Sequence, residues 1–391
     1  MLGRTGSPPA LTRLAFRGRN ALARFSIALP IVWLDDCRPA ASLAESESAQ
    51  AVGPRTGGRR VVCEVALPPV RLYRFEDATV ESASATFTFY DQIVIERAAG
   101  LDAARCSFEG GHVRANGRRL ATIERRPEVA IERGFFLSGY GYWNYYHWLI
   151  ELLPKMRYWL ALPPELRAWP VLVGESVLSA PSYLEALSLF CPDPDVFVMR
   201  DDIAYRVGSV LHINAPNTSP FNLRPHTRLK VSDFLLRPDT IHDLRVRAGL
   251  SDHTQPGGRR LFLARSGPRR SYNQDEVMEL FGEAGFEPIF LERMSLHEQI
   301  AAVSGAELLA GPSGAAWTNL VFCAPGARAL CWMDEYSRDF AAFSTLAHVV
   351  GVDLRYLLYP SAARSTADVY SAGYRLDLNR LREELGALTG D

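Results

Sequence analysis

The strongest constraint on the fold is an alternation of apolar runs and helix-like segments between Arg259 and Trp332. The runs are almost continuously apolar, as expected of strands covered on both faces, and segments with helical spacing of apolar residues separate them. Strands are expected at residues 261–264, 287–291, 308–310 and 327–332, and helices at 275–284, 296–304 and 315–322. Repeated strand–helix–strand units predict a parallel, doubly wound α/β sheet in this half of the chain.

The first half carries more strands. Strand-like segments are residues 85–90, 93–95, 134–137, 169–174, 196–199 and 207–213, and helix-like segments are 145–160, 182–190 and 224–236. A Pro/Gly/polar stretch at 251–258 separates the halves. The predicted organisation is a tail at 1–60, a first domain at 61–238, a second domain at 239–375 and a C-terminal helix at 376–391.

The first sixty residues differ in composition from the rest. Residues 1–24 contain five arginines and no acidic residue, and residues 40–58 are rich in Ser, Ala and Gly. The apolar run at 25–34 is only about ten residues long, whereas a spanning helix needs roughly 20. A flexible or targeting-like tail is therefore expected through residue 60.

Charge and cysteine content exclude several classes of protein. The 43 basic and 44 acidic residues nearly balance, so no overall field favours nucleic acid. The six cysteines form no C-x-x-C pair, and neither a structural zinc site nor a disulfide framework is predicted. A reducing compartment is the simpler interpretation, with buried thiols at Cys323 and Cys331.

One turn in the second half has the features of an anion site. The segment Gly311-Pro-Ser-Gly-Ala-Ala-Trp-Thr-Asn319 follows an expected strand and opens an expected helix. Such a turn presents backbone N–H groups to an anion, and the side chains of Ser313, Thr318 and Asn319 add neutral donors. It is neither a Walker loop nor G-x-G-x-x-G, so ATP hydrolysis and hydride transfer are disfavoured. A diphosphate held without a dedicated lysine or metal fits this turn.

Arginines gather around the first strand of the same half, at positions 259, 260, 265, 269 and 270. Arg265 lies where that strand ends, and ligands of such sheets bind outside the carboxyl ends of strands. Guanidinium groups suit phosphate because they stay charged and offer a planar fork of donors. The alternative is a solvated basic loop. Glu292 also follows a strand end, where it either binds a ribose hydroxyl or merely precedes the next helix.

The first half holds a candidate acid–base pair in Asn144-Tyr-Tyr-His-Trp-Leu-Ile-Glu-Leu-Leu-Pro-Lys155. His147, Glu151 and Lys155 are four residues apart and share a helix face, and Asn144 is a natural N-cap. A histidine one turn from a carboxylate suits a general base with its orienting partner, and Glu151 could itself be the base. Alternatives are a helix-face salt bridge beside a tyrosine-rich core and a metal site, for which no third ligand is evident. The surrounding aromatic residues suit a sugar or nucleoside platform; they are Tyr140, Tyr142, Trp143, Tyr145, Tyr146 and Trp148.

A two-residue D-x-D element offers a different reading. Asp193 and Asp195 could chelate Mn²⁺ as in metal-dependent transferases, although a proline-rich turn before a strand explains the same residues.

Taken in order, these motifs resemble glycosyltransferase family 61, also called DUF563, over roughly residues 74–332. They are Asn144-Tyr-Tyr-His147 with Glu151 and Pro154, Arg265 with Arg270 and residues 273–276, Leu291-Glu292 with Ser295 and Gln299, Gly311 to Ala315 with Thr318 and Asn319, and Pro325-Gly326. The family includes xylan arabinosyl- and xylosyltransferases, O-linked N-acetylglucosaminyltransferases and proteins labelled capsular polysaccharide biosynthesis. Members often have His at the position of Ser313 and Gly at that of Ala316, so the resemblance does not specify the donor or the leaving-group contact at these two positions.

The resemblance implies an inverting, metal-free GT-B-type enzyme with two Rossmann-like domains and a cleft between them. The C-terminal half would hold a nucleotide-sugar, and the N-terminal half would bind a glycan hydroxyl, with Asn144, Tyr145 and Lys155 on the acceptor side. The expected location of the protein is the cytoplasm, with peripheral association at the inner face of the membrane. The expected role is in surface or capsular polysaccharide synthesis. The alternatives are a non-catalytic nucleotide-sugar-binding partner protein and a metal-dependent GT-A enzyme using Asp193 and Asp195.

Overall fold

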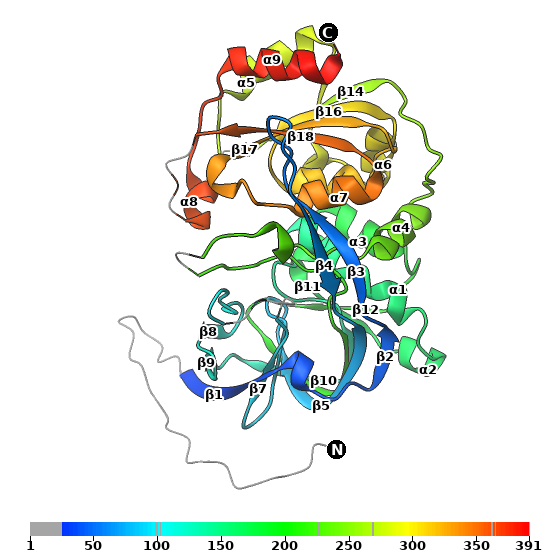
Figure 1. The fold of residues 1–391 in the computed structure, drawn as a ribbon. Helices are drawn as coiled ribbons and strands as arrows, with labels where there is room; N and C mark the ends of the chain where they lie inside the picture. Colours follow the sequence, from blue (N-terminus) through cyan, green and yellow to red (C-terminus); the bar gives the residue numbers. More distant parts are fainter. Residues whose placement is uncertain are drawn as a thin grey trace.

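The computed structural model describes residues 26–97, 101, 103–224, 227–267, 270–360, 363 and 365–390. Within these residues the chain is a mixed α/β protein, as predicted, with one main sheet in each half (Figure 1). The basic segment expected at 1–24, the start of the apolar run and Arg269 lie outside the described residues.

The C-terminal sheet has five parallel strands within the described part of the chain, in the order β15-β14-β16-β17-β18. The strands are β14 (Arg259–Leu263), β15 (Glu287–Ile289), β16 (Ala306–Pro312), β17 (Arg328–Asp334) and β18 (Asp353–Tyr359). Helices α5 (Gln274–Glu283) and α9 (Leu378–Thr389) bury their apolar residues on one face. The helices α6 (Leu296–Ser304), η6 (Ala315–Phe322) and α7 (Ala342–Val350) cover the other. The predicted parallel, doubly wound sheet is confirmed.

The N-terminal sheet is larger and mixed. Its path among the described residues is β12-β11-β10-β13-β5-β6-β7-β1-β9-β8, with β2 pairing β5. Its strands are β1 (Ser26–Trp33), β2 (Ala41–Ala44), β5 (Val70–Val80), β6 (Thr86–Thr88), β7 (Ile93–Ile95), β8 (Val113–Asn116), β9 (Leu120–Glu124), β10 (Glu128–Phe136), β11 (Val171–Gly174), β12 (Val196–Met199) and β13 (Ala204–Ile213). The strands from β12 to β13 are parallel, whereas β5 joins β13 antiparallel.

The other helical elements lie between or after these strands. They are η1 (Leu34–Asp36), η2 (His147–Leu152), α1 (Lys155–Trp159), α2 (Pro164–Arg167), η3 (Glu175–Leu178), α3 (Pro181–Ser188), η4 (Val231–Asp233), α4 (Pro238–Arg247), η5 (Leu291–Arg293), η7 (Glu335–Ser337) and α8 (Thr366–Ser371). The described residues contain no helix that is both long and apolar enough to cross a membrane.

Residues 26–60 differ from the flexible tail that was expected. Strand β1 is inserted between β7 and β9, and β2 lies beside β5. Strands β3 (Glu47–Val52) and β4 (Val62–Leu67) form an antiparallel hairpin, which we call the N-terminal arm (residues 47–67). The arm reaches from the N-terminal half to the C-terminal sheet (Figure 1). There the Val52 N–H donates to Thr345 Oγ1 at 3.0 Å, and Ser344 Oγ donates to the Val52 carbonyl at 2.6 Å.

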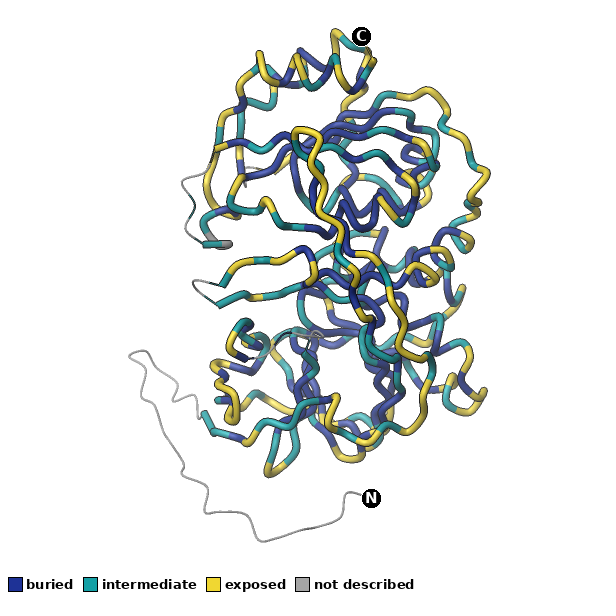
Figure 2. Tube along the Cα trace, viewed as in Figure 1, coloured by how far each residue is buried: buried dark blue, intermediate teal, exposed yellow. Residues whose placement is uncertain are grey.

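One hydrophobic core continues through both halves. Trp148 and Leu149 from the N-terminal half belong to the same buried cluster as Trp317 and Leu346 from the C-terminal half. Figure 2 shows the buried residues along the strands of both sheets and in the layer between them. The two halves are therefore packed together over a broad interface.

The helix expected at residues 224–236 is wrong over its described part. Residues 227–236 contain only the short turn η4, and α4 starts after them. Leu235 instead forms a backbone bridge with Thr218, and Arg105 holds Asp233 at 2.7 Å. These long-range contacts replace the local hydrogen bonds of a helix. The described residues contain no disulfide, and Cys323 and Cys331 are buried as predicted.

Candidate active site

The helix that carries His147 is a π-helix where the spacing predicted an α-helix. Pro154 explains the change, because proline has no N–H to donate to the carbonyl four residues earlier, at Ile150. That carbonyl accepts a hydrogen bond from Asn217 Nδ2 at 2.7 Å. At the start of the segment, the Asn144 side chain accepts from the Tyr146 N–H at 2.9 Å, as expected of a helix-initiating residue. π-Helical turns are frequent at functional sites.

His147 and Glu151 form the predicted pair despite the wider helix. His147 Nδ1 lies 2.7 Å from Glu151 Oε2, and Ser219 Oγ donates to Glu151 Oε1 at 2.6 Å. Both side chains are mostly buried. Gly141 makes room for the ring, because a Cβ at this position would lie 2.6 Å from His147 Cδ2. Both carboxylate oxygens of Glu151 are thus engaged, whereas no hydrogen bond among the described residues uses His147 Nε2.

Lys155 belongs to a buried charge cluster that the sequence did not reveal. Its Nζ lies 3.7 Å from Glu96 Oε2, which also meets His212 Nε2 at 2.9 Å. Burial raises the pKa of Glu96, but the charges of Lys155 and His212 and its hydrogen bonds outweigh burial and lower it to about 2. Burial lowers the pKa of Lys155 and of His212. Glu96 and His212 come from distant segments, and nothing in their local sequence signals the cluster.

Three of the six aromatic residues proposed as a binding platform are core residues. Tyr142, Tyr146 and Trp148 are buried, and Trp148 Nε1 donates to the Tyr183 carbonyl at 3.1 Å. Tyr145 packs edge-on against Tyr183. Of this group Trp143 is the clearly exposed member. The platform interpretation is therefore wrong for the buried rings, because aromatic density marks core as readily as a binding surface.

In the C-terminal half, Arg265 and Arg270 converge on one carbonyl. Arg265 Nη2 donates to the Ser313 carbonyl, and Arg270 Nη1 donates to the same oxygen at 3.1 Å. Gln274 fixes the Arg265 backbone, accepting from its N–H and donating to its carbonyl, both at 2.9 Å. Arg265 follows β14 and Ser313 follows β16, the neighbouring strands at which the strand order reverses. Ligands of open parallel sheets bind at this switch point.

The two guanidinium groups lack an acidic partner. Among the described residues, no carboxylate forms an ion pair with either of them, and Arg270 Nε is buried without a hydrogen bond. Burial lowers the pKa of Arg265, and the charge of Arg270 lowers it further. Because arginine stays protonated in proteins, these shifts mark an electrostatic cost that a bound anion would relieve.

Three stacked tyrosines lie next to the arginines. Tyr374 stacks between Tyr272 and Tyr359, with ring centroids 5.2 and 4.1 Å apart. The C-terminal segment is held there by Asn273, whose Oδ1 accepts from the Leu376 N–H at 2.9 Å. The Asn273 side chain makes no cap hydrogen bond to α5. At the start of α6, Ser295 and Glu298 form a capping box.

The remaining residues predicted to bind the sugar donor either lie near the arginines or are buried inside η6. Glu292 lies at the same strand edge, where its Oε1 accepts from the Ser266 N–H at 3.0 Å and Ser266 Oγ at 2.5 Å. Gly311 and Gly314 allow close packing of β16 and of Arg265. Ala315 starts η6 beside them, whereas Thr318 and Asn319 are buried inside η6. The oxygens Thr318 Oγ1 and Asn319 Oδ1 have no partner among the described residues.

The D-x-D residues are on the surface. Asp193 and Asp195 are exposed in the loop before β12. In the described part of the chain, no group of three or more His, Cys, Asp and Glu side chains is arranged to hold a metal ion.

The structure thus brings the candidate residues together as two groups. His147 and Glu151 belong to the N-terminal half, and the arginines and the glycine turn to the C-terminal half. A family model described as Glycosyltransferase 61 matches residues 145–330, a range that contains both groups. No curated protein matches the chain.

Proposed function

We propose that this chain, which belongs to glycosyltransferase family 61, transfers a sugar from a nucleotide-sugar to a hydroxyl group with inversion at the anomeric carbon. The nucleoside diphosphate would bind at Arg265 and Arg270, and the acceptor would bind at His147 and Glu151. The two halves would then act as the two sides of a GT-B-like enzyme. No metal is required, because the arginines supply the positive charge.

The observation that carries this proposal is the pair of guanidinium groups on the Ser313 carbonyl. They lie at the switch point of a parallel sheet, and no carboxylate in the described part of the chain forms an ion pair with them. When the bond from the anomeric carbon to the diphosphate breaks, negative charge grows on the leaving oxygen. Preorganised guanidinium groups stabilise that charge more than they stabilise the ground state.

The contacts of His147 and Glu151 favour different roles for the two residues. Both carboxylate oxygens of Glu151 are engaged, one by Ser219 Oγ and one by His147 Nδ1, so Glu151 suits the orienting role. His147 Nε2 then takes the proton of the acceptor hydroxyl while its oxygen attacks the anomeric carbon. One displacement without a covalent intermediate inverts the configuration.

Nucleotide binding tests the donor site. UDP, GDP and CMP are titrated calorimetrically into the wild type, Arg265→Ala and Arg270→Ala. Each substitution should weaken binding of the preferred nucleotide about 10- to 100-fold, since hydrogen bonds to charged groups contribute ~1.5–3 kcal/mol. Arg259→Ala is the matched control, because Arg259 lies at the opposite end of β14, paired with Glu287 at 2.9 Å. Equal affinity in all four proteins, or equal losses in the control, would refute the donor site.

The wider role follows the family resemblance. The proposed acceptor is a glycan hydroxyl, the transferred sugar a hexose or pentose, and the product a surface or capsular polysaccharide assembled on the cytoplasmic side of the membrane. A non-catalytic nucleotide-sugar-binding protein would bind the nucleotide in the same titration but release none from its sugar conjugate when glycan acceptors are added.

A further inference from the structure

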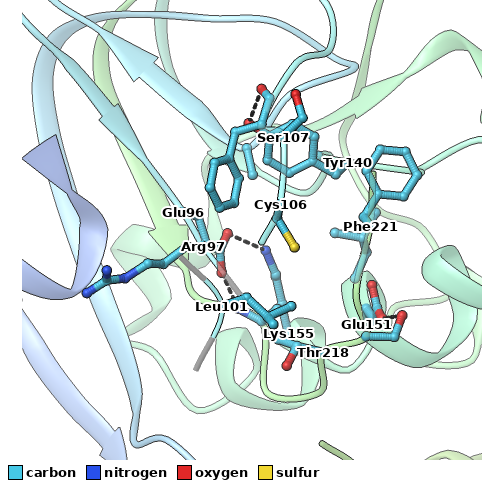
Figure 3. A pocket seen from close by; sticks show the side chains of 16 residues that line it. Glu96, Arg97, Leu101, Cys106, Ser107, Tyr140, Glu151, Lys155, Thr218 and Phe221 are labelled. Carbon is cyan, nitrogen blue, oxygen red and sulfur yellow. Dashed lines mark hydrogen bonds and ion pairs between the residues drawn. The ribbon is translucent and has the colours of Figure 1, made fainter. Parts of the chain in front are cut away.

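A small cavity lies beside Glu151 in the N-terminal half. Its volume is about 70 Å³, and all the residues that line it belong to this half. Figure 3 shows its composition: the rings of Tyr140 and Phe221 on one side, and the charged groups of Glu96, Lys155 and Glu151 below them. A hydroxyl-bearing ligand needs such a mixture of apolar faces and charged hydrogen-bonding groups.

The ammonium group of Lys155 is buried without a hydrogen bond. The residue is 0% exposed, and the distance of 3.7 Å to Glu96 Oε2 exceeds that of a hydrogen bond. The Glu96 oxygens are already used, Oε1 by the Ala215 N–H at 2.6 Å and Oε2 by His212. Buried donors are almost always satisfied in proteins, so this one points to a ligand or water in the cavity.

The identity of the side chain supports a specific role. Position 155 holds one of only two lysines in the chain, and the other, Lys230, is exposed. Arginine is used at nearly every other basic position, yet its fork would not fit a small cavity. A compact ammonium with three rotatable donors can follow hydroxyl groups of different orientation.

Charge limits the ligand. Glu96 and Glu151 lie on different sides of Lys155, so they already balance its charge and repel an anion (Figure 3). One water needs roughly 10–15 Å³ by this measure, so a cavity of about 70 Å³ has room for several hydroxyl groups. A nucleotide is too negative, whereas the hydroxyl-bearing edge of one sugar ring is suitable.

We infer that this cavity binds the uncharged sugar ring of the acceptor, with Lys155 Nζ donating a hydrogen bond to a ring hydroxyl. The apolar face of the ring would lie on Tyr140 and Phe221, and the bound ring would be held next to the His147–Glu151 pair. This assignment of the acceptor rests on the proposed transferase function. The existence of a sugar site does not.

Saturation-transfer NMR tests the site in the full chain. The probes are the methyl β-glycosides of glucose, galactose and xylose, with glucuronate as the anionic comparison. Lys155→Met removes the ammonium group, and Ala215→Leu fills the cavity while its backbone N–H still bonds Glu96. Lys230→Met is the matched lysine control. Thermal unfolding identifies any variant that fails to fold, and UDP and GDP binding is measured in the same samples.

We expect at least one neutral glycoside to bind the wild type and Lys230→Met. Its affinity should fall at least tenfold in Lys155→Met and its signal should vanish in Ala215→Leu, with nucleotide binding unchanged. The inference is overturned if no glycoside binds the wild type, if both cavity variants bind like the wild type, or if glucuronate binds best. If a glycoside binds the wild type but neither UDP nor GDP does, the donor site is refuted and the cavity assignment stands.

Discussion

His147 Nδ1 lies 2.7 Å from Glu151 Oε2, in a π-helical segment that ends two residues before Pro154. The carboxylate accepts the Nδ1–H of the neutral ring, which places the lone pair on Nε2. A histidine with this tautomer can take a proton from a hydroxyl. The geometry therefore ranks the two residues, with His147 as the proposed base and Glu151 as its positioning partner.

Substitution of the pair tests that ranking. His147→Ala should lower kcat by ~10²–10⁴, the usual effect of losing a general base, and leave nucleotide affinity unchanged. Glu151→Gln should cost less, because the base survives in a less ordered orientation. Release of nucleoside diphosphate at saturating donor measures both. His242→Ala, at an exposed histidine, is the control. A larger loss in Glu151→Gln than in His147→Ala would reverse the roles.

Two glycines of the donor turn should respond differently to alanine. At Gly311 a Cβ would lie 2.7 Å from Leu263 Cβ and 3.1 Å from its carbonyl oxygen, within a packed sheet. Gly311→Ala should therefore lower the free energy of unfolding by ~1–3 kcal/mol. At Gly314 the Cβ would meet the end of the Arg265 side chain at 2.9 Å, which can move.

Gly314→Ala should consequently leave stability nearly unchanged and weaken nucleotide binding. Urea denaturation and calorimetric titration separate the two effects. If Gly314→Ala binds nucleotide like the wild type, the position of the Arg265 guanidinium does not matter for the donor.

The Ile150 carbonyl predicts a coupling between two distant positions. Asn217→Ala removes its partner and leaves buried polar groups unpaired, which should cost about 1–3 kcal/mol or more, because Asn217 also bonds Thr240 and Arg237. Pro154→Ala supplies an N–H that can satisfy the same carbonyl. In a double-mutant cycle by urea denaturation, the Asn217→Ala cost should be smaller in the Pro154→Ala background. Strict additivity would show that the proline does not cause the need for Asn217.

Acid stability should depend on Glu96. Its pKa is lowered from 4.5 to about 2 in the folded chain, mainly by Lys155 and His212 acting against burial. Between these values the unfolded chain binds a proton that the folded chain does not, so stability falls as the pH falls, by at most ~1.4 kcal/mol per pH unit. Above pH 4.5 this contribution is fully present.

Glu96→Gln should therefore flatten the loss of stability between pH 4.5 and 2, whatever its effect on stability at neutral pH. Urea denaturation at several pH values gives both slopes. Identical slopes in the two proteins would mean that Glu96 is not held ionised by its neighbours.

The C-terminal sheet was predictable because most of its strands are buried on both faces and read as apolar runs. The exceptions have physical causes. Strand β18 lies at the sheet edge and mixes charged with apolar residues, so no run is visible. Helix α7 is buried over most of its surface, because its polar residues Ser344 and Thr345 face the N-terminal arm and not solvent.

The candidate site was only partly readable for a similar reason. Spacing placed His147 beside Glu151 because both belong to one helix. Lys155 was predicted on the acceptor side, but its partner Glu96 follows β7, and sheet pairing, which local periodicity does not specify, brings them together. The platform prediction failed for Tyr142, Tyr146 and Trp148 because composition does not say which rings face the core.

The N-terminal arm connects the two halves through hydrogen bonds and an ion pair. The arm makes further contacts besides its bonds to α7. The Arg55 carbonyl accepts from the Tyr356 N–H at 3.0 Å, and the Arg55 side chain pairs with Asp353 at 2.7 Å. A segment that begins in one half thus shields the open edge of β18 in the other. A chain that starts at residue 61 would lose these contacts and would expose unpaired backbone groups of β18 to other molecules. The stretch predicted to be a flexible tail therefore makes contacts that would have to break before the two halves could separate.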